Sequence, residues 1–248
     1  MNKRNIVRLL LTLTVIFILN ISDLVELHKN AVDFELNLGN EFDKVFSELL
    51  FGFHRIDTGL NTAKFSQLAF LAAAPLFLGQ NISADLSISG TYYFTRQNNR
   101  TVWYVKRTLS LLGYSFVIAS FTCLLNTLMT EYYDVGSVPK TRVALVLLSL
   151  TFCICTLLML SNIAGIFFGS VIGLAAAVLF AAIGMLLVAT PMRAASIVYN
   201  CTFRLDETYA DMAVKVSINA AYSIALFIAG LAVIKKKELS LVNAEHLF

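Results

Sequence analysis

The sequence predicts an all-α membrane protein in which six helices span the membrane and both termini lie in the cytoplasm. Of its 248 residues, 58% are hydrophobic and only 14% are charged, whereas soluble proteins carry about 25% charged residues. The mean hydropathy is +0.74. Several apolar runs are each long enough to cross a bilayer. A chain of this length suffices for one transmembrane domain over residues 1–248, without an attached soluble catalytic domain.

The first predicted span covers residues 6–24 and follows a basic start that contains Lys3, Arg4 and Arg8. A cleaved signal peptide is the alternative, but no small-x-small cleavage site follows Ile21. We therefore expect this span to stay in the chain and to enter the membrane from the cytoplasm.

An acid-rich outer segment, residues 22–64, comes next. Within it, six apolar residues recur with the spacing of one helix face: Phe42, Val45, Phe46, Leu49, Leu50 and Phe53. An amphipathic helix outside a membrane either lies in the interface or covers the mouth of the bundle, and both roles stay open.

The second and third predicted spans cover residues 65–82 and 108–130. Pro75 lies inside the second span, where the missing backbone donor and the clash of the ring are expected to kink the helix. A short outer loop, EYYDVGSVPKTR, follows the third span and balances two acids with two bases.

Residues 143–188 form an apolar run that is too long for one crossing, because a span needs only about 20 residues. Ser161 and Asn162 are the polar interruption in this run. We therefore place a tight cytoplasmic turn at these two residues. The fourth predicted span then covers residues 143–160, and the fifth covers residues 163–188.

Three glycines near the start of the fifth predicted span, Gly165, Gly169 and Gly173, follow one another at intervals of four residues. This spacing removes side chains from one helix face and allows another helix to approach closely. The partner helix belongs either to this chain or to a second copy. In both cases Gly169→Leu is expected to push the packed helices apart.

Residues 190–212 mix apolar and polar residues, and we expect them to form short outer helices that dip back toward the membrane, or an ordered loop. The sixth predicted span covers residues 213–234 and ends at three lysines that act as a cytoplasmic stop signal. Lys215 sits near the end of this span, where its side chain can extend to water.

The distribution of charge gives this topology its orientation. The predicted inner segments carry ten cations and three acids, whereas the outer segments carry nine cations and thirteen acids. The outer cations are spread over much longer segments, so the dense basic segments are the inner ones. We therefore place both termini on the cytoplasmic side.

Motifs for catalysis or metal binding are missing from the sequence. It contains no GxxxxGK[ST] phosphate loop, HExxH, paired-cysteine zinc spacing or GxSxG. The three histidines are scattered, and the four cysteines lie mostly in apolar runs, which is typical of small buried hydrophobic residues. We expect no enzymatic activity, no metal, no cofactor in this chain and no nucleic-acid partner.

The most distinctive stretch is the predicted cytoplasmic loop, residues 80–107. It holds four cations, Arg96, Arg100, Lys106 and Arg107, and one acid, Asp85. A Gly-Thr step, an aromatic run, an arginine after a short turn and a lysine entering the next span occur in that order: Gly90, Thr91, Tyr92, Tyr93, Phe94, Arg100 and Lys106.

This order resembles the coupling loop and third span of the small type-2 ATP-binding-cassette (ABC) exporter permeases of Gram-positive bacteria. The closest in style are those that export phenol-soluble modulins or other peptide toxins, or that confer lantibiotic immunity. Two features differ from the family pattern. Asp85 lies five residues before the glycine, where the family has an acid about three before. Residues 97–99 replace a proline common in the turn.

The resemblance implies a permease subunit in the bacterial plasma membrane that exports an amphipathic or hydrophobic substrate, expected to be a peptide. A separate ATPase subunit would hold ATP and Mg²⁺, and a second permease copy or a homologue would complete a dimer. Residues 84–97 would form a coupling helix that docks on the ATPase. Its contact residues would be Asp85, Gly90, Thr91, an aromatic anchor of Tyr92, Tyr93 and Phe94, and a charged rim of Arg96 and Arg100.

Two alternatives stay open. The same aromatic residues can form an interfacial belt, with the arginines bound to anionic membrane lipid. At the level of function, the alternative is a non-transporting membrane immunity or assembly factor that binds its partner through the outer segment.

Overall fold

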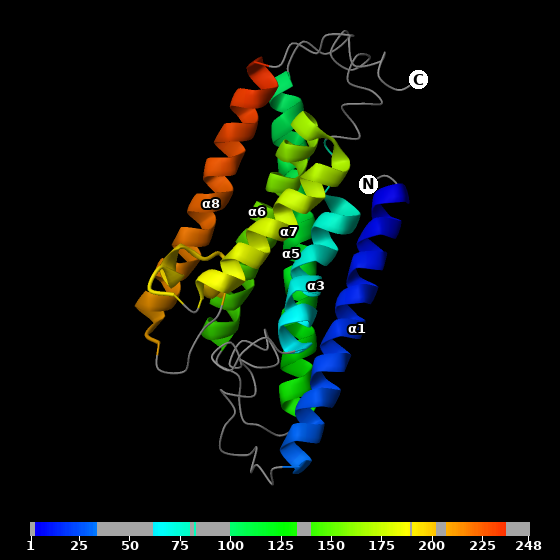
Figure 1. The fold of residues 1–248 in the computed structure, drawn as a ribbon, viewed down its shortest axis with the longest axis vertical. Coiled ribbons are helices and arrows are strands. Elements are labelled where there is room, and N and C mark those ends of the chain that lie inside the picture. The colour runs from blue at the N-terminus through cyan, green and yellow to red at the C-terminus, as the bar shows by residue number, and fades with distance from the viewer. Residues whose placement is uncertain are drawn as a thin grey trace.

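The computed structural model describes residues 3–33, 62–79, 82, 100–132, 140–188, 190–201 and 207–236 (Figure 1). All regular elements in these ranges are helices, which confirms the all-α prediction there. The long helices and two short 3-10 helices are α1 (Lys3–Asp33), α3 (Thr62–Leu78), α5 (Arg100–Tyr132), α6 (Lys140–Phe168), α7 (Ser170–Leu187), η3 (Arg193–Ala195), η4 (Tyr199–Cys201) and α8 (Tyr209–Lys236).

Four helices in the described part of the chain are long and apolar enough to cross a membrane, namely α5, α6, α7 and α8. Shorter apolar helical stretches occur in α1, at Asn5–Ile21, and in α3, at Leu68–Leu78. These lengths and compositions are those of a helical membrane protein. The number of six crossings stays a prediction. The predicted amphipathic helix at residues 42–53 lies outside the described ranges.

Successive helices run in alternating directions along the bundle (Figure 1). The start of α1, the end of α3, the start of α5, the α6–α7 turn and the end of α8 therefore lie at one end, at the top of the view. We call it the basic end. Within the described ranges, its helix turns carry no acid and these eight cations: Lys3, Arg4, Arg8, Arg100, Lys106, Arg107, Lys235 and Lys236.

The described residues toward the opposite end of the bundle carry equal charge of both signs, with six cations and six acids. This end holds the end of α1, the start of α3, the α5–α6 junction and the segment from α7 to α8 (Figure 1). The two ends thus differ strongly in charge, which matters for orientation in a membrane.

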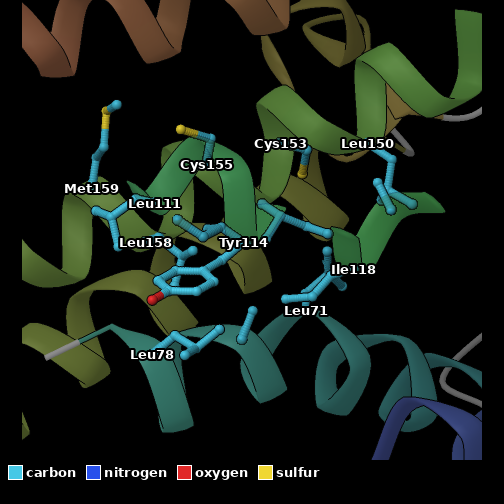
Figure 2. Packing of buried hydrophobic residues seen from close by; sticks show 14 of the residues in the cluster. Leu71, Leu78, Leu111, Tyr114, Ile118, Leu150, Cys153, Cys155, Leu158 and Met159 are labelled. Carbon is cyan, nitrogen blue, oxygen red and sulfur yellow. The ribbon is translucent and has the colours of Figure 1, made fainter. Parts of the chain in front are cut away.

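Helix α6 lies at the centre of the packing, since it contacts α3, α5, α7 and α8. From Val143 to Phe168 its sequence is apolar or weakly polar all round, as expected for a helix with contacts on several sides. Figure 2 shows side chains of α3, α5 and α6 interlocked in the core, including Leu78, Ile118 and Leu158. All four cysteines are free and buried, as predicted for small hydrophobic residues.

The predicted turn at Ser161 and Asn162 is wrong, because α6 continues through both residues to Phe168. Asn162 can be buried at little cost in free energy because both ends of its amide are hydrogen-bonded. Its Nδ2 donates to the Leu158 carbonyl at 2.7 Å, and its Oδ1 accepts from the Ile82 backbone N–H at 2.8 Å. The chain turns instead at Gly169, where φ is +91°. A glycine adopts this conformation most readily.

Helices α1 and α5 also extend well beyond their predicted spans. Helix α1 runs to Asp33, beyond the predicted boundary at residue 24, and α5 starts at Arg100, eight residues before the predicted span. The reason is that apolar content marks only the part of a helix suited to a membrane, whereas the backbone hydrogen bonds of the helix also form in the polar residues beyond it. Pro75 lies inside α3, and the expected kink stays a prediction.

Candidate functional site

The predicted docking residues are only partly within the structure. Asp85, Gly90, Thr91, Tyr92, Tyr93, Phe94 and Arg96 lie outside the described ranges, while Arg100 is the first residue of α5. Since α3 ends and α5 begins at the basic end (Figure 1), the segment that joins them is attached there at both of its ends. The docking role of its residues stays a prediction.

The prediction that Gly165, Gly169 and Gly173 share one helix face is wrong. Because the chain turns at Gly169, Gly165 belongs to α6 and Gly173 to α7. A Cβ atom on Gly173 would overlap the Ser161 carbonyl oxygen and lie 2.8 Å from the Gly165 nitrogen. These two glycines therefore allow close approach within one helical hairpin. A Cβ on Gly169 would meet no atom of the described residues within 4 Å, its chain neighbours aside.

A different row of small residues forms the inner face of α7. Its buried members are Gly173, Ala177, Ala181 and Gly184. A Cβ atom on Gly184 would lie 3.1 Å from a Val198 methyl carbon, and the Ser196 hydroxyl donates to the Gly184 carbonyl at 2.6 Å. The small face of α7 thus packs against α6 and against the segment that follows α7, which we call the cap segment (residues 190–201).

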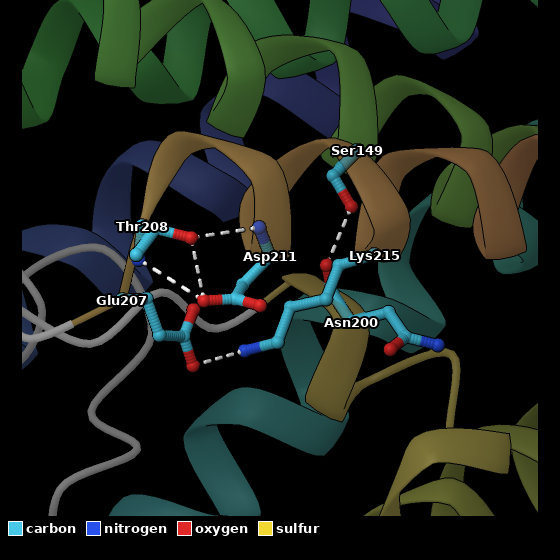
Figure 3. A network of polar contacts seen from close by, with 6 residues as sticks. All are labelled: Ser149, Asn200, Glu207, Thr208, Asp211 and Lys215. Atoms are coloured by element: carbon cyan, nitrogen blue, oxygen red, sulfur yellow. Dashed lines mark hydrogen bonds and ion pairs between the residues drawn. The ribbon is translucent and has the colours of Figure 1, made fainter.

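A buried polar cluster fixes the cap segment to α6 and α8 (Figure 3). It lies at the end of the bundle opposite the basic end (Figure 1). The Ser149 hydroxyl in α6 donates to the Asn200 carbonyl at 2.7 Å. Asn219 Nδ2 in α8 lies 2.9 Å from Ser149 Oγ and 3.2 Å from the Ile197 carbonyl oxygen. All three polar side chains are fully buried. Bonds of this kind are strong where water is excluded.

An ion pair extends this cluster along α8. Lys215 Nζ lies 2.5 Å from Glu207 Oε1, and the side chains are only 8% and 12% exposed. The same ammonium lies 4.2 Å from the centre of the Tyr199 ring, within the range of a cation–π contact. The expectation that Lys215 extends to water is therefore wrong. A carboxylate and an aromatic ring inside the protein replace the solvent.

The start of α8 is fixed by a capping box next to the ion pair. The Thr208 hydroxyl donates to Asp211 Oδ2 at 2.7 Å, and the Thr208 backbone N–H reaches the same oxygen at 3.2 Å. The Asp211 backbone N–H donates in return to the Thr208 hydroxyl at 3.2 Å. A Thr-x-x-acid pattern before an apolar run is a recognised helix-start signal, and it could have located this feature in the sequence.

Sequence reasoning missed the cluster because its members are far apart in the chain. Three buried acceptor oxygens in it have no hydrogen-bond partner among the described residues: Asn200 Oδ1, Asn219 Oδ1 and Glu207 Oε2. Among the residues that the structure describes, no group of three or more His, Cys, Asp or Glu could hold a metal ion. What the arrangement does is mechanical, because it joins the cap segment to α6 and α8.

No protein-family model, no curated protein and no solved structure matches this chain.

Proposed function

We propose that this chain is the permease subunit of an ABC exporter in a bacterial plasma membrane. It moves an amphipathic or hydrophobic substrate, a peptide, out of the cell with energy from ATP hydrolysis in a separate subunit. The observation that supports the proposal is the charge at the end of the bundle where α3 ends and α5 begins. Eight cations gather there without an acid among the described residues, and the sequence between these two helices, residues 80–99, carries the motif.

The charge of this end supports its location in the cytoplasm. Lysines and arginines next to membrane spans are retained on the cytoplasmic side, and they attract the anionic inner leaflet. An ATPase subunit binds ATP in the cytoplasm, so its docking segment must lie on that side. The motif and the charge therefore favour the same orientation.

Helix α5 follows residues 80–99, which we call the docking segment, and connects them to the bundle. It has 33 residues and no interruption, which corresponds to about 50 Å of continuous helix. Its first residue, Arg100, adjoins the segment in which Tyr92, Tyr93 and Phe94 would bind a groove on the ATPase. Aromatic and arginine side chains dominate the energetics of such interfaces. ATP-driven closure of two ATPase subunits would then move two permease copies against each other.

Alanine substitution of the aromatic anchor tests the proposal. The Tyr93→Ala/Phe94→Ala variant should insert normally and recover much less ATPase in co-purification. Loss of a buried interface aromatic costs about 2 kcal/mol or more, or roughly thirtyfold in affinity. Phe167→Ala/Phe168→Ala is a matched control, since these adjacent aromatics are 54% and 67% exposed near the same end. That control should retain the ATPase like the parent.

Two results would count against the proposal in different ways. Equal recovery of the ATPase by the parent and the Tyr93→Ala/Phe94→Ala variant would favour the interfacial belt over the docking role. Failure of the parent to recover an ATPase would favour the non-transporting immunity or assembly factor.

A further inference from the structure

Tyr104 is an aromatic side chain buried near the start of α5, one turn after Arg100. Its exposed fraction is only 2%. The ring stacks on Phe227 of α8, with 5.8 Å between the ring centres and 23° between the planes. The bulk of this side chain is therefore inserted between the start of α5 and the last turns of α8, which lie side by side at the basic end (Figure 1).

Gly230 provides the space for this insertion. A Cβ atom on Gly230 would overlap the Tyr104 hydroxyl oxygen and lie 2.6 Å from the ring carbon Cζ. The ring is enclosed, so it cannot swing out of the way without opening the contact between the helices. Even one methyl group at position 230 must therefore separate α5 from α8 or expel the ring.

Helix α8 also holds the cap segment at the opposite end of the bundle. Asn219 binds the Ile197 carbonyl oxygen, and Lys215 binds Glu207 and the Tyr199 ring. Between Lys215 and Gly230 the helix is continuous and covers about 22 Å. One rigid element therefore contacts Tyr104 at one end and the cap segment at the other.

We propose that Tyr104 in the Gly230 notch locks α5 and α8 into one body, so that a displacement entering at the start of α5 reaches the cap segment through α8. The lock is a property of the bundle itself, whereas its use in transport rests on the proposed function. Tyr104 and Gly230 are thus positioning residues that connect the ATPase side of the permease to its outer end. Neither residue contacts the substrate in this scheme.

The lock is tested by pulsed electron paramagnetic resonance on the full chain in lipid nanodiscs. Spin labels at Val102→Cys and Ile228→Cys report the distance between α5 and α8, since these positions are 45% and 59% exposed. The four native cysteines are buried, so they are not replaced in the spin-labelled variants. The parent should give one narrow distance, and Gly230→Ala should give a longer and broader one.

Three further variants make this test specific. Gly113→Ala adds the same methyl group to α5 where no atom lies within 4 Å, and it should match the parent. Tyr104→Ala removes the ring without adding bulk, and it should also broaden the distance. Tyr104→Leu/Gly230→Ala should return toward the parent, because the smaller side chain leaves room for the methyl group. A Gly230→Ala distance identical to that of Gly113→Ala would overturn the lock.

Transmission to the cap segment is measured separately, with the co-purified ATPase. Thiol labelling at Ala194→Cys, an exposed cap position, should change on addition of ATP and Mg²⁺ in the parent. In Gly230→Ala the ATPase should be retained while this change is lost. An unaltered nucleotide response in Gly230→Ala would refute transmission through the lock. If the parent recovers no ATPase, the proposed function fails while the spin-label result still decides the lock.

Discussion

At the scale of single residues, buried polar side chains determine how the cap segment is joined to α6 and α8. Lys215 illustrates this, because its ammonium is held between the Glu207 carboxylate and the Tyr199 ring and not in water. Glu207, with which it forms the ion pair, lies eight residues earlier in the chain, across the start of α8. Ser149, Asn200 and Asn219 come together from three separate elements. No local pattern in the sequence encodes such pairings, so the sequence predicted a lysine near water and no cluster.

Removal of one member of the ion pair is expected to destabilise the protein. Lys215→Met leaves the Glu207 carboxylate buried without its cation, and breaking a buried pair in this way typically costs about 3–5 kcal/mol. The exposed Lys140 on α6 provides a control, and Lys140→Met should cost little. Detergent or thermal unfolding of the purified protein measures both changes.

The double variant Lys215→Met/Glu207→Leu should recover much of this loss, because apolar residues of similar volume often replace a buried pair without net cost. Equal stability of Lys215→Met and the parent would show that the pair contributes nothing to the attachment of the cap segment.

At the scale of elements, the boundaries of the helices could be predicted only in part. The apolar runs located every long helix, because burial in a membrane or in the centre of a bundle requires apolar residues. Three boundaries failed. Helices α1 and α5 continue through polar or basic residues that hydropathy excludes from a span, and Asn162 stays within α6 because its side-chain amide is fully paired. The turn depends on the backbone of Gly169, which hydropathy does not report.

Substitutions in the α6–α7 hairpin should separate backbone strain from side-chain overlap. At Gly169 the cost comes from φ of +91°, so Gly169→Ala and Gly169→Leu should destabilise by a similar amount, about 1–3 kcal/mol. At Gly173 the cost comes from overlap with α6, so Gly173→Leu should be much worse than Gly173→Ala.

The comparison of these four unfolding free energies corrects the initial expectation for Gly169→Leu. That expectation placed the glycine against a neighbouring helix, but no atom lies within 4 Å of a Cβ built there. A Leu variant far less stable than the Ala variant at position 169 would restore the packing explanation.

The described residues differ between the two ends of the bundle. One end gathers basic residues around the start of α5 and the end of α8, and the other holds the cap segment and its buried polar cluster. The all-α architecture could be predicted from composition and apolar runs. The proposed ATPase-docking role rests on a sequence motif, whereas the polar cluster and the Tyr104 notch required the three-dimensional arrangement.

The proposed function depends most directly on one condition, namely that the basic end of the bundle lies in the cytoplasm. Cysteine labelling of intact cells with a membrane-impermeant thiol reagent tests it, at the exposed positions Ala194 and Lys106 and at Asn98 in the docking segment. Ala194→Cys should be labelled from outside, while Lys106→Cys and Asn98→Cys should react only after the cells are permeabilised. Labelling of Lys106→Cys or Asn98→Cys in intact cells would contradict a cytoplasmic ATPase docking site.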